Sequence, residues 1–162
     1  MKKILLVRHA KSSWDNFSIS DHDRPLNDRG NHDAPIMASK MKNENLSTQA
    51  IYTSSAKRAK ETAEFFSKSF GVQKKDFFTI PRLYHSSPDT ILDVISEVDD
   101  QYDSVAVFCH NPGITYFANI ILDQDIDNIA TCGILAMNAE VDSWVKISKD
   151  NLKFNSYFYP KM

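Results

Sequence analysis

Short apolar runs alternate along this chain with stretches in which apolar positions recur every three to four residues. Four runs have the length and the β-branched or aromatic content of buried strands: residues 4–7, 50–53, 77–80 and 104–109. Four stretches have the spacing of one helix face: residues 34–41, 56–69, 89–98 and 114–121. This alternation predicts an α/β fold in which helices pack in layers on a mostly parallel central sheet.

The remaining segments complete this picture. Residues 133–141 and 143–148 predict an antiparallel pair of strands that turns near Asp142, and residues 152–159 predict an edge strand. Residues 11–28 are polar and rich in turn-forming residues, and a loop of that length in a compact domain usually has a function. We find no repeat or linker, so the sequence predicts one domain over residues 1–162.

Composition narrows the classes of partner. The net charge of −2 provides no overall positive field, so nucleic acid is not expected as a partner. No run approaches the roughly 20 apolar residues of a membrane span, and no membrane partner is expected. Cys109 and Cys132 lie far apart and lack metal-type spacing, which indicates reduced thiols and a cytoplasmic location.

Charged side chains stand where three of the predicted strands give way to the next segment. Arg8 and His9 end the first strand, Arg58 follows the second, and His110 follows the strand over 104–109. The carboxyl ends of parallel strands open on one edge of a sheet, where ligands bind, so these four side chains are expected to converge. Arginines, imidazoles and helix N-termini together favour a phosphoryl group.

Local capping signals fit the same junctions. Asn27 is expected to cap the helix that begins near Asp28, and Ser54 and Ser55 are expected to cap the helix over 56–69.

Four ordered motifs resemble those of the histidine phosphatase superfamily, whose fold is the phosphoglycerate-mutase-like αβα sandwich of three layers. Residues 8–14 (Arg-His-Ala-Lys-Ser-Ser-Trp) resemble its Arg-His-Gly opening, and residues 23–30 its Asp-x-Pro-Leu-Thr-x-x-Gly segment. Residues 54–63 resemble its Ser-x-x-x-Arg-Ala-x-x-Thr-Ala motif, and residues 109–112 its Ser-His-x-Pro motif. The short SixA-type branch, the phosphohistidine phosphatases, is the most similar.

The resemblance implies a phosphatase that works in two steps through a covalent intermediate. His9 would be the nucleophile, while Arg8, Arg58 and His110 would bind the phosphoryl oxygens as catalytic and phosphate-binding residues. Two flanking guanidinium groups disfavour protonation of the nucleophilic imidazole, which suits this role. The resemblance implies no metal and no cofactor.

One departure from the family concerns the general acid. Larger branches carry a glutamate after the third strand, whereas residues 81–88 of this chain contain no carboxylic acid. A general acid is typically worth about 10²–10⁴-fold in rate, but an imidazole leaving group needs it less than an alkoxide does. The sequence therefore favours protein phosphohistidine as the substrate. His22 and His85 are alternative proton donors, although both are expected to be surface residues. A small phosphoester metabolite, or a non-catalytic phosphate-binding module, is the alternative.

Simpler roles stand beside these. A lone histidine such as His9 or His110 is usually a satisfied core residue. Arg24 and Arg29 are expected to be solvated or salt-bridged, and Lys11 to lie near the pocket. Three aromatic residues are expected to pack or to wall the site: Trp14, Tyr84 and Phe117.

Overall fold

The computed structural model describes residues 1–161 and contains one six-stranded sheet in the order β3-β2-β4-β1-β5-β6. The strands are β1 (Lys2–Arg8), β2 (Ala50–Thr53), β3 (Phe77–Thr79), β4 (Ser104–Cys109), β5 (Ile134–Ala139) and β6 (Lys153–Phe158). The α-helices are α1 (Asp28–Asn43), α2 (Lys57–Phe70), α3 (Pro88–Ser96) and α4 (Gly113–Leu122). Every predicted α-helix is therefore present, with ends shifted by a few residues.

The sheet is mostly parallel, as the alternating pattern predicted. β1 pairs in parallel with β4, and β2 pairs in parallel with both β4 and β3. β5 runs antiparallel to its neighbours β1 and β6. β6 lies at the edge, which confirms the prediction for residues 152–159.

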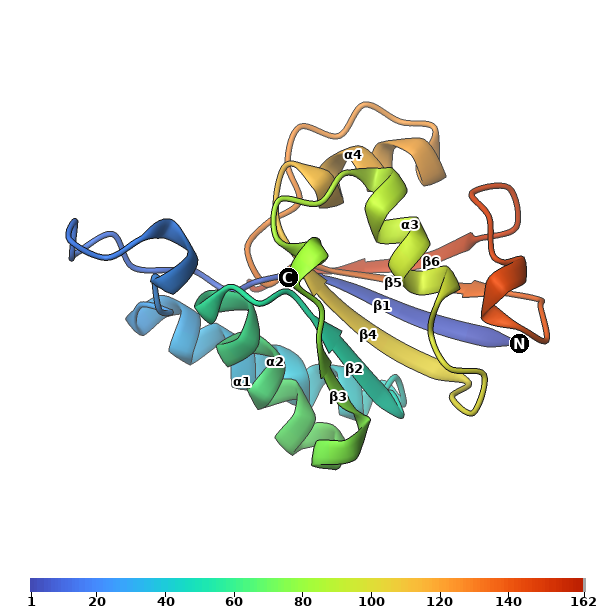
Figure 1. Ribbon diagram of the computed structural model, residues 1–162, viewed down its shortest axis with the longest axis horizontal. Coiled ribbons are helices and arrows are strands. Elements are labelled where there is room, and N and C mark those ends of the chain that lie inside the picture. The colour runs from blue at the N-terminus through green and yellow to red at the C-terminus, as the bar shows by residue number, and fades with distance from the viewer. Residues whose placement is uncertain (162) are drawn as a thin grey trace.

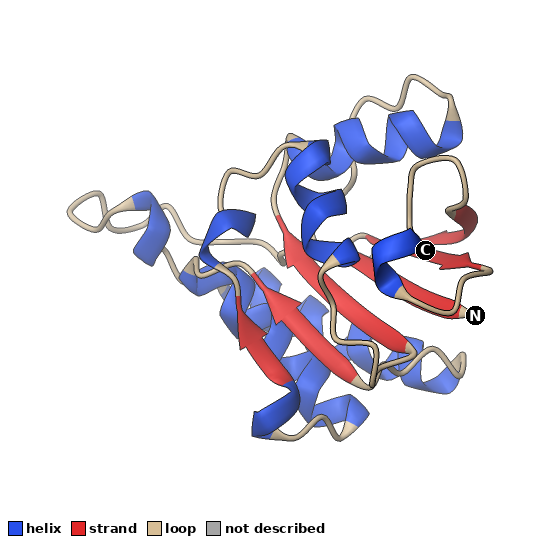
Figure 2. Cartoon of the chain, turned by 45° about the vertical axis from the view of Figure 1, so that its right-hand side comes forward, coloured by secondary structure: helices blue, strands red, loops and turns tan. Residues whose placement is uncertain are grey.

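Helices cover both faces of this sheet, so the fold has three layers (Figures 1 and 2). Successive residues of β1 point to opposite faces: Ile4 and Leu6 belong to the core beneath α3 and α4, while Leu5 and Val7 belong to the core beneath α1 and α2. A strand buried on both faces reads as a continuous apolar run, which is why β1 lacks polar alternation.

The predicted strand over residues 143–148 is wrong. This segment holds a short 3-10 helix, Trp144–Lys146, and β5 pairs with β1 and β6 instead. Trp144 and Ile147 are buried while Val145 is exposed, so the burial period is three rather than two. The Trp144 indole donates to the main-chain oxygen of Tyr102 at 2.8 Å, which fixes this turn against the core.

Capping follows the prediction at α1 but not at α2. The Asn27 side chain accepts a hydrogen bond from the main-chain N–H of Gly30 at 2.9 Å. The N-cap of α2 is Ala56, whose side chain has no polar atom that could cap the helix. The hydroxyls of Ser54 and Ser55 hydrogen-bond with His110 and His22, and Ser54 also accepts from the N–H of Ala56. Among residues 1–161, no helix is long and apolar enough to cross a membrane.

Candidate active site

The four predicted site residues line one pocket at the carboxyl edge of the sheet. Arg8 ends β1, His9 follows it, Arg58 lies in the first turn of α2, and His110 follows β4. The pocket has a volume of about 480 Å³. The convergence predicted from the strand ends is therefore present, although the four positions are spread over a hundred residues of sequence.

Each ring nitrogen of His9 makes one hydrogen bond. Its Nδ1 lies 2.7 Å from the main-chain oxygen of Ala10, and because a carbonyl only accepts, Nδ1 carries the proton. Its Nε2 is therefore unprotonated, and its lone pair accepts a hydrogen bond from the Nε–H of Arg58 at 3.4 Å. Burial, together with the nearby guanidinium groups of Arg58 and Arg8, lowers the pKa of His9 to about 3. His9 is thus a neutral imidazole at neutral pH.

His110 lies beside His9, with ring centroids 5.1 Å apart. Its Nε2 and the hydroxyl of Ser54 form a hydrogen bond of 2.7 Å, which fixes the ring. Its Nδ1 is buried and has no hydrogen-bond partner in the described structure. Burial, with smaller contributions from His9 and Arg58, lowers the pKa of His110 to about 2. A bound phosphoryl group would favour the protonated form of this ring.

The two arginines offer unused donors. Arg8 donates through Nη1 to the main-chain oxygen of Ile129 at 2.7 Å, while its buried Nε–H has no partner in the described structure. Arg58 is 5% exposed and donates through Nη1 to the main-chain oxygen of Asp21 at 2.7 Å. A buried guanidinium with spare N–H groups is a binding element for an oxyanion.

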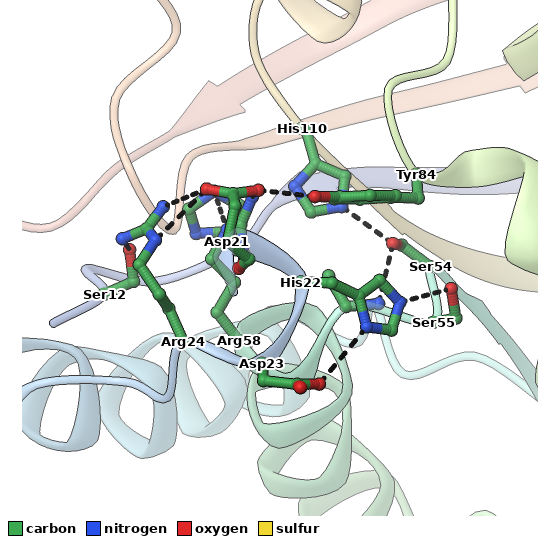
Figure 3. Close-up of polar contacts among 12 residues, drawn as sticks. Ser12, Asp21, His22, Asp23, Arg24, Ser54, Ser55, Arg58, Tyr84 and His110 are labelled. Carbon is green, nitrogen blue, oxygen red and sulfur yellow. Dashed lines mark hydrogen bonds and ion pairs between the residues drawn. The ribbon is translucent and has the colours of Figure 1, made fainter. Parts of the chain in front are cut away.

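Asp21 is the site residue that the sequence reasoning missed. It lies in a short 3-10 helix, Asp21–Asp23, within the loop before α1, and its carboxylate accepts from Arg58, Arg24 and Tyr84 (Figure 3). Partial burial raises the pKa of Asp21, but the hydrogen bond from Tyr84 and the two guanidinium groups outweigh it, and the net pKa is well below its ordinary value. A cation in the first turn of α2 was a signal that an anion must lie nearby.

The remaining predicted residues separate into two groups. Lys11, Trp14 and His85 line the pocket, whereas His22 binds the Ser55 hydroxyl at 2.9 Å and does not line it. Phe117 is buried in the core beneath α3 and α4.

The salt-bridge predictions hold for both remaining arginines. Arg24 pairs with Asp21 at 3.0 Å, and Arg29 pairs with Asp33 at 2.9 Å.

The arrangement can bind a phosphoryl group and attack it. A neutral imidazole with an unprotonated Nε2 lies near guanidinium groups that can neutralise the oxygens of that phosphoryl group. Within residues 1–161 no group of three His, Cys, Asp or Glu side chains has a metal-binding arrangement.

Comparisons with known proteins give consistent findings. The family model of the histidine phosphatase superfamily (branch 1) matches residues 4–83. An uncharacterised protein of Mycobacterium tuberculosis is 30% identical over 115 residues, which cover 71% of this chain and 69% of that protein. The structure is similar to a crystal structure of the putative phosphohistidine phosphatase SixA from Agrobacterium tumefaciens, with a TM-score of 0.82, 23% identity and 98% of both chains covered.

A second solved structure, of the protein histidine phosphatase SixA complexed with tungstate, has a TM-score of 0.81 and 19% identity. The match covers 98% of this chain and 97% of the SixA chain. At these identities the two solved structures show the same fold. The family model matches residues 4–83, a range that includes three of the four motifs described above.

Proposed function

Because this chain belongs to the histidine phosphatase superfamily and is a phosphatase, we propose that its substrate is a phosphohistidine side chain of another protein. His9 is the proposed nucleophile, and Arg8, Arg58 and His110 are the proposed ligands of the phosphoryl oxygens. The reaction needs no metal or cofactor in this proposal.

The geometry of His9 carries the assignment. Its Nε2 is unprotonated because Nδ1 donates to the main-chain oxygen of Ala10. In the first step Nε2 forms a bond to phosphorus while the bond from phosphorus to the substrate imidazole breaks. In the second step water attacks phosphorus, the bond to His9 breaks, and inorganic phosphate leaves. The two guanidinium groups offset the charge on the oxygens in both steps, a contribution of about 3 kcal/mol per well-placed donor.

The substrate preference follows from the acid–base groups of the pocket. Among its described lining residues, Asp21 is the one carboxylic acid, and its lowered pKa keeps it ionised. An ionised carboxylate cannot protonate a leaving group. An alkoxide leaving group needs that proton, whereas the imidazole of phosphohistidine leaves with little help, so the pocket suits a phosphoramidate better than a phosphoester.

Two similarities support this proposal. Solved structures that share this fold include a putative phosphohistidine phosphatase and a protein histidine phosphatase. The second is a complex with tungstate, an oxyanion with a tetrahedral shape like that of phosphate. The location in the cytoplasm stays a prediction from the sequence.

Chemical quenching tests the proposal directly. The protein is incubated with a radiolabelled phosphohistidine peptide, quenched in alkali, and divided into samples at acid and alkaline pH. We expect a label on the wild type that is stable in alkali and lost in acid, and no label on His9→Gln. His32→Gln, an exposed position on α1, is the matched control and should label like the wild type.

Each other outcome assigns a different function. Equal labelling of His9→Gln would refute the nucleophile. A wild type that hydrolyses small phosphoesters faster than the peptide would make a metabolite phosphatase the better assignment. Phosphate binding without any label or turnover would indicate a non-catalytic module.

A further inference from the structure

The carboxylate of Asp21 accepts four hydrogen bonds from three side chains (Figure 3). Arg24 donates to Oδ1 through Nε at 3.1 Å and through Nη2 at 3.0 Å. Arg58 donates to Oδ2 through Nη2 at 3.1 Å, and the Tyr84 hydroxyl donates to Oδ2 at 2.6 Å. Two oxygens offer about four lone-pair sites, so the carboxylate is saturated.

All three nitrogens of the Arg24 guanidinium donate hydrogen bonds. Arg24 is 7% exposed, and its Nη1 donates to the Ser12 hydroxyl at 2.6 Å and to the main-chain oxygen of Ser13 at 3.2 Å. Its guanidinium lies 3.6 Å from the ring centroid of Trp14. The loop before α1 therefore fixes Arg24, and through Arg24 it fixes the carboxylate.

Asp21 accepts two hydrogen bonds from Arg58. The main-chain oxygen of Asp21 accepts from Nη1 at 2.7 Å, and its Oδ2 accepts from Nη2. Two contacts on different nitrogens define the plane of a guanidinium group. Of the five N–H groups of Arg58, these contacts use two and the contact with His9 uses one, so two remain free.

We propose that Asp21 is a positioning residue that aims the Nε–H of Arg58 at the lone pair of His9 and keeps two N–H groups of Arg58 free for phosphoryl oxygens. This inference rests on the proposed function for its consequence in catalysis. When Nε2 of His9 bonds to phosphorus its lone pair is consumed, and the Nε–H of Arg58 can turn to an oxygen of the arriving phosphoryl group. A guanidinium held by Asp21 through its two Nη atoms needs only a small movement for that exchange.

The charge of Asp21 serves the same end. Arg58 lies in the first turn of α2, where the helix dipole is unfavourable to a cation. The ion pair with Asp21 keeps the guanidinium there before a phosphoryl group arrives. Arg24 offsets the negative charge of Asp21, so the approaching substrate still meets a net positive pocket.

Imidazole ¹⁵N NMR tests the positioning without any turnover. In wild type, the Nε2 signal of His9 should be that of an unprotonated nitrogen that accepts a hydrogen bond; His9→Gln identifies the signal by its loss. In Asp21→Asn we expect this signal to move toward the position of a nitrogen without a hydrogen bond. The matched control is Asp23→Asn, which removes the same charge from an exposed neighbour and should leave the signal in place. An unmoved His9 signal in Asp21→Asn would overturn the proposal.

Kinetics test the consequence. With phosphohistidine peptide, Asp21→Asn should lower kcat about tenfold and change KM less than about twofold, because misplacement of a binding group costs up to about 10²-fold in the chemical step. A rise in kcat/KM would show that Asp21 blocks the site rather than building it. Arg24→Lys keeps the positive charge but loses the paired Nε and Nη2 donors that bind Oδ1 of Asp21, and it should also lower kcat. If Asp21→Asn fails to fold, Arg24→Lys decides by the same two readouts.

The two proposals fail separately. A wild type without turnover of the peptide would refute the proposed substrate, while the NMR comparison would still confirm or refute the contact that Asp21 maintains.

Discussion

Some side chains that are not proposed ligands of the phosphoryl group orient the side chains that are. Ser54 is a clear case, because its hydroxyl lies 2.7 Å from Nε2 of His110 and 3.2 Å from the main-chain N–H of Ala56. A serine expected to cap α2 thus orients the second histidine while it still accepts one N–H near the start of that helix. The geometry of His110 depends on this hydroxyl.

Ser54→Ala should therefore lower both stability and activity. The change leaves Nε2 of the buried His110 and the N–H of Ala56 without a partner, at a cost of about 1–3 kcal/mol. We expect kcat/KM to fall about tenfold, because the His110 ring loses its fixed orientation. Urea unfolding and steady-state kinetics measure the two effects. Ser55→Ala, whose partner His22 lies outside the pocket, should retain near wild-type kcat/KM; an equal loss in both variants would contradict the role of Ser54.

At the scale of elements, the pocket depends on how the loop before α1 packs against that helix. The main-chain oxygen of Lys11 accepts from the N–H of Asn27 at 3.0 Å and lies where a Cβ on Gly30 would be, at 2.2 Å. Gly30 in α1 is therefore required by the close approach of two backbones. The same loop carries Asp21 and Arg24, which line the pocket, so this packing affects the active site.

Gly30→Ala should destabilise the protein despite the better helix propensity of alanine. The propensity gain is about 1 kcal/mol, whereas forced overpacking costs about 1–3 kcal/mol and must displace the backbone at Lys11. We expect a lower midpoint of urea unfolding and a lower kcat. Ser39→Ala, exposed on the same helix, is the control and should be neutral or slightly stabilising. A Gly30→Ala variant as stable as wild type would show that the loop can shift freely.

For the whole molecule, two buried neutral histidines couple folding to pH. The pKa values of His9 and His110 are about 3 and about 2 in the folded state, against an ordinary value of 6.5. At pH values between the folded-state pKa of each histidine and its ordinary value of 6.5, the unfolded chain binds more protons than the folded chain. The free energy of unfolding therefore rises with pH through this window and falls as the solution is acidified. The lowered pKa of Asp21 acts in the same direction below about pH 4.

Between about pH 8 and about pH 5, the free energy of unfolding of the wild type should therefore fall by about 2 kcal/mol more than that of His9→Asn. Below the ordinary histidine pKa, each tenfold rise in proton concentration favours the protonated unfolded chain by about 1.4 kcal/mol. Denaturant unfolding at both pH values measures this difference. His32→Asn removes an exposed histidine and should lose as much as wild type. Equal losses in wild type and His9→Asn would mean that His9 is protonated in the folded protein near pH 5.

Much of the fold and four members of the site follow from the sequence alone. Apolar runs and helical spacing predict the strands and helices, because burial acts on each segment at its own period. Arg8, His9, Arg58 and His110 could be placed together because parallel strands end on one edge.

Only the tertiary structure decided how the site is held. Asp21, Tyr84 and Ser54 act through pairings between segments far apart in the chain, whereas Arg24 pairs within its own loop. Polar side chains in a loop carry no periodicity that reveals such partners. The segment over 143–148 was mistaken for a strand for a related reason, since the burial of Trp144 comes from distant residues. Local patterns determine which elements form; contacts across the fold determine which charges neutralise one another and which remain free for a phosphoryl group.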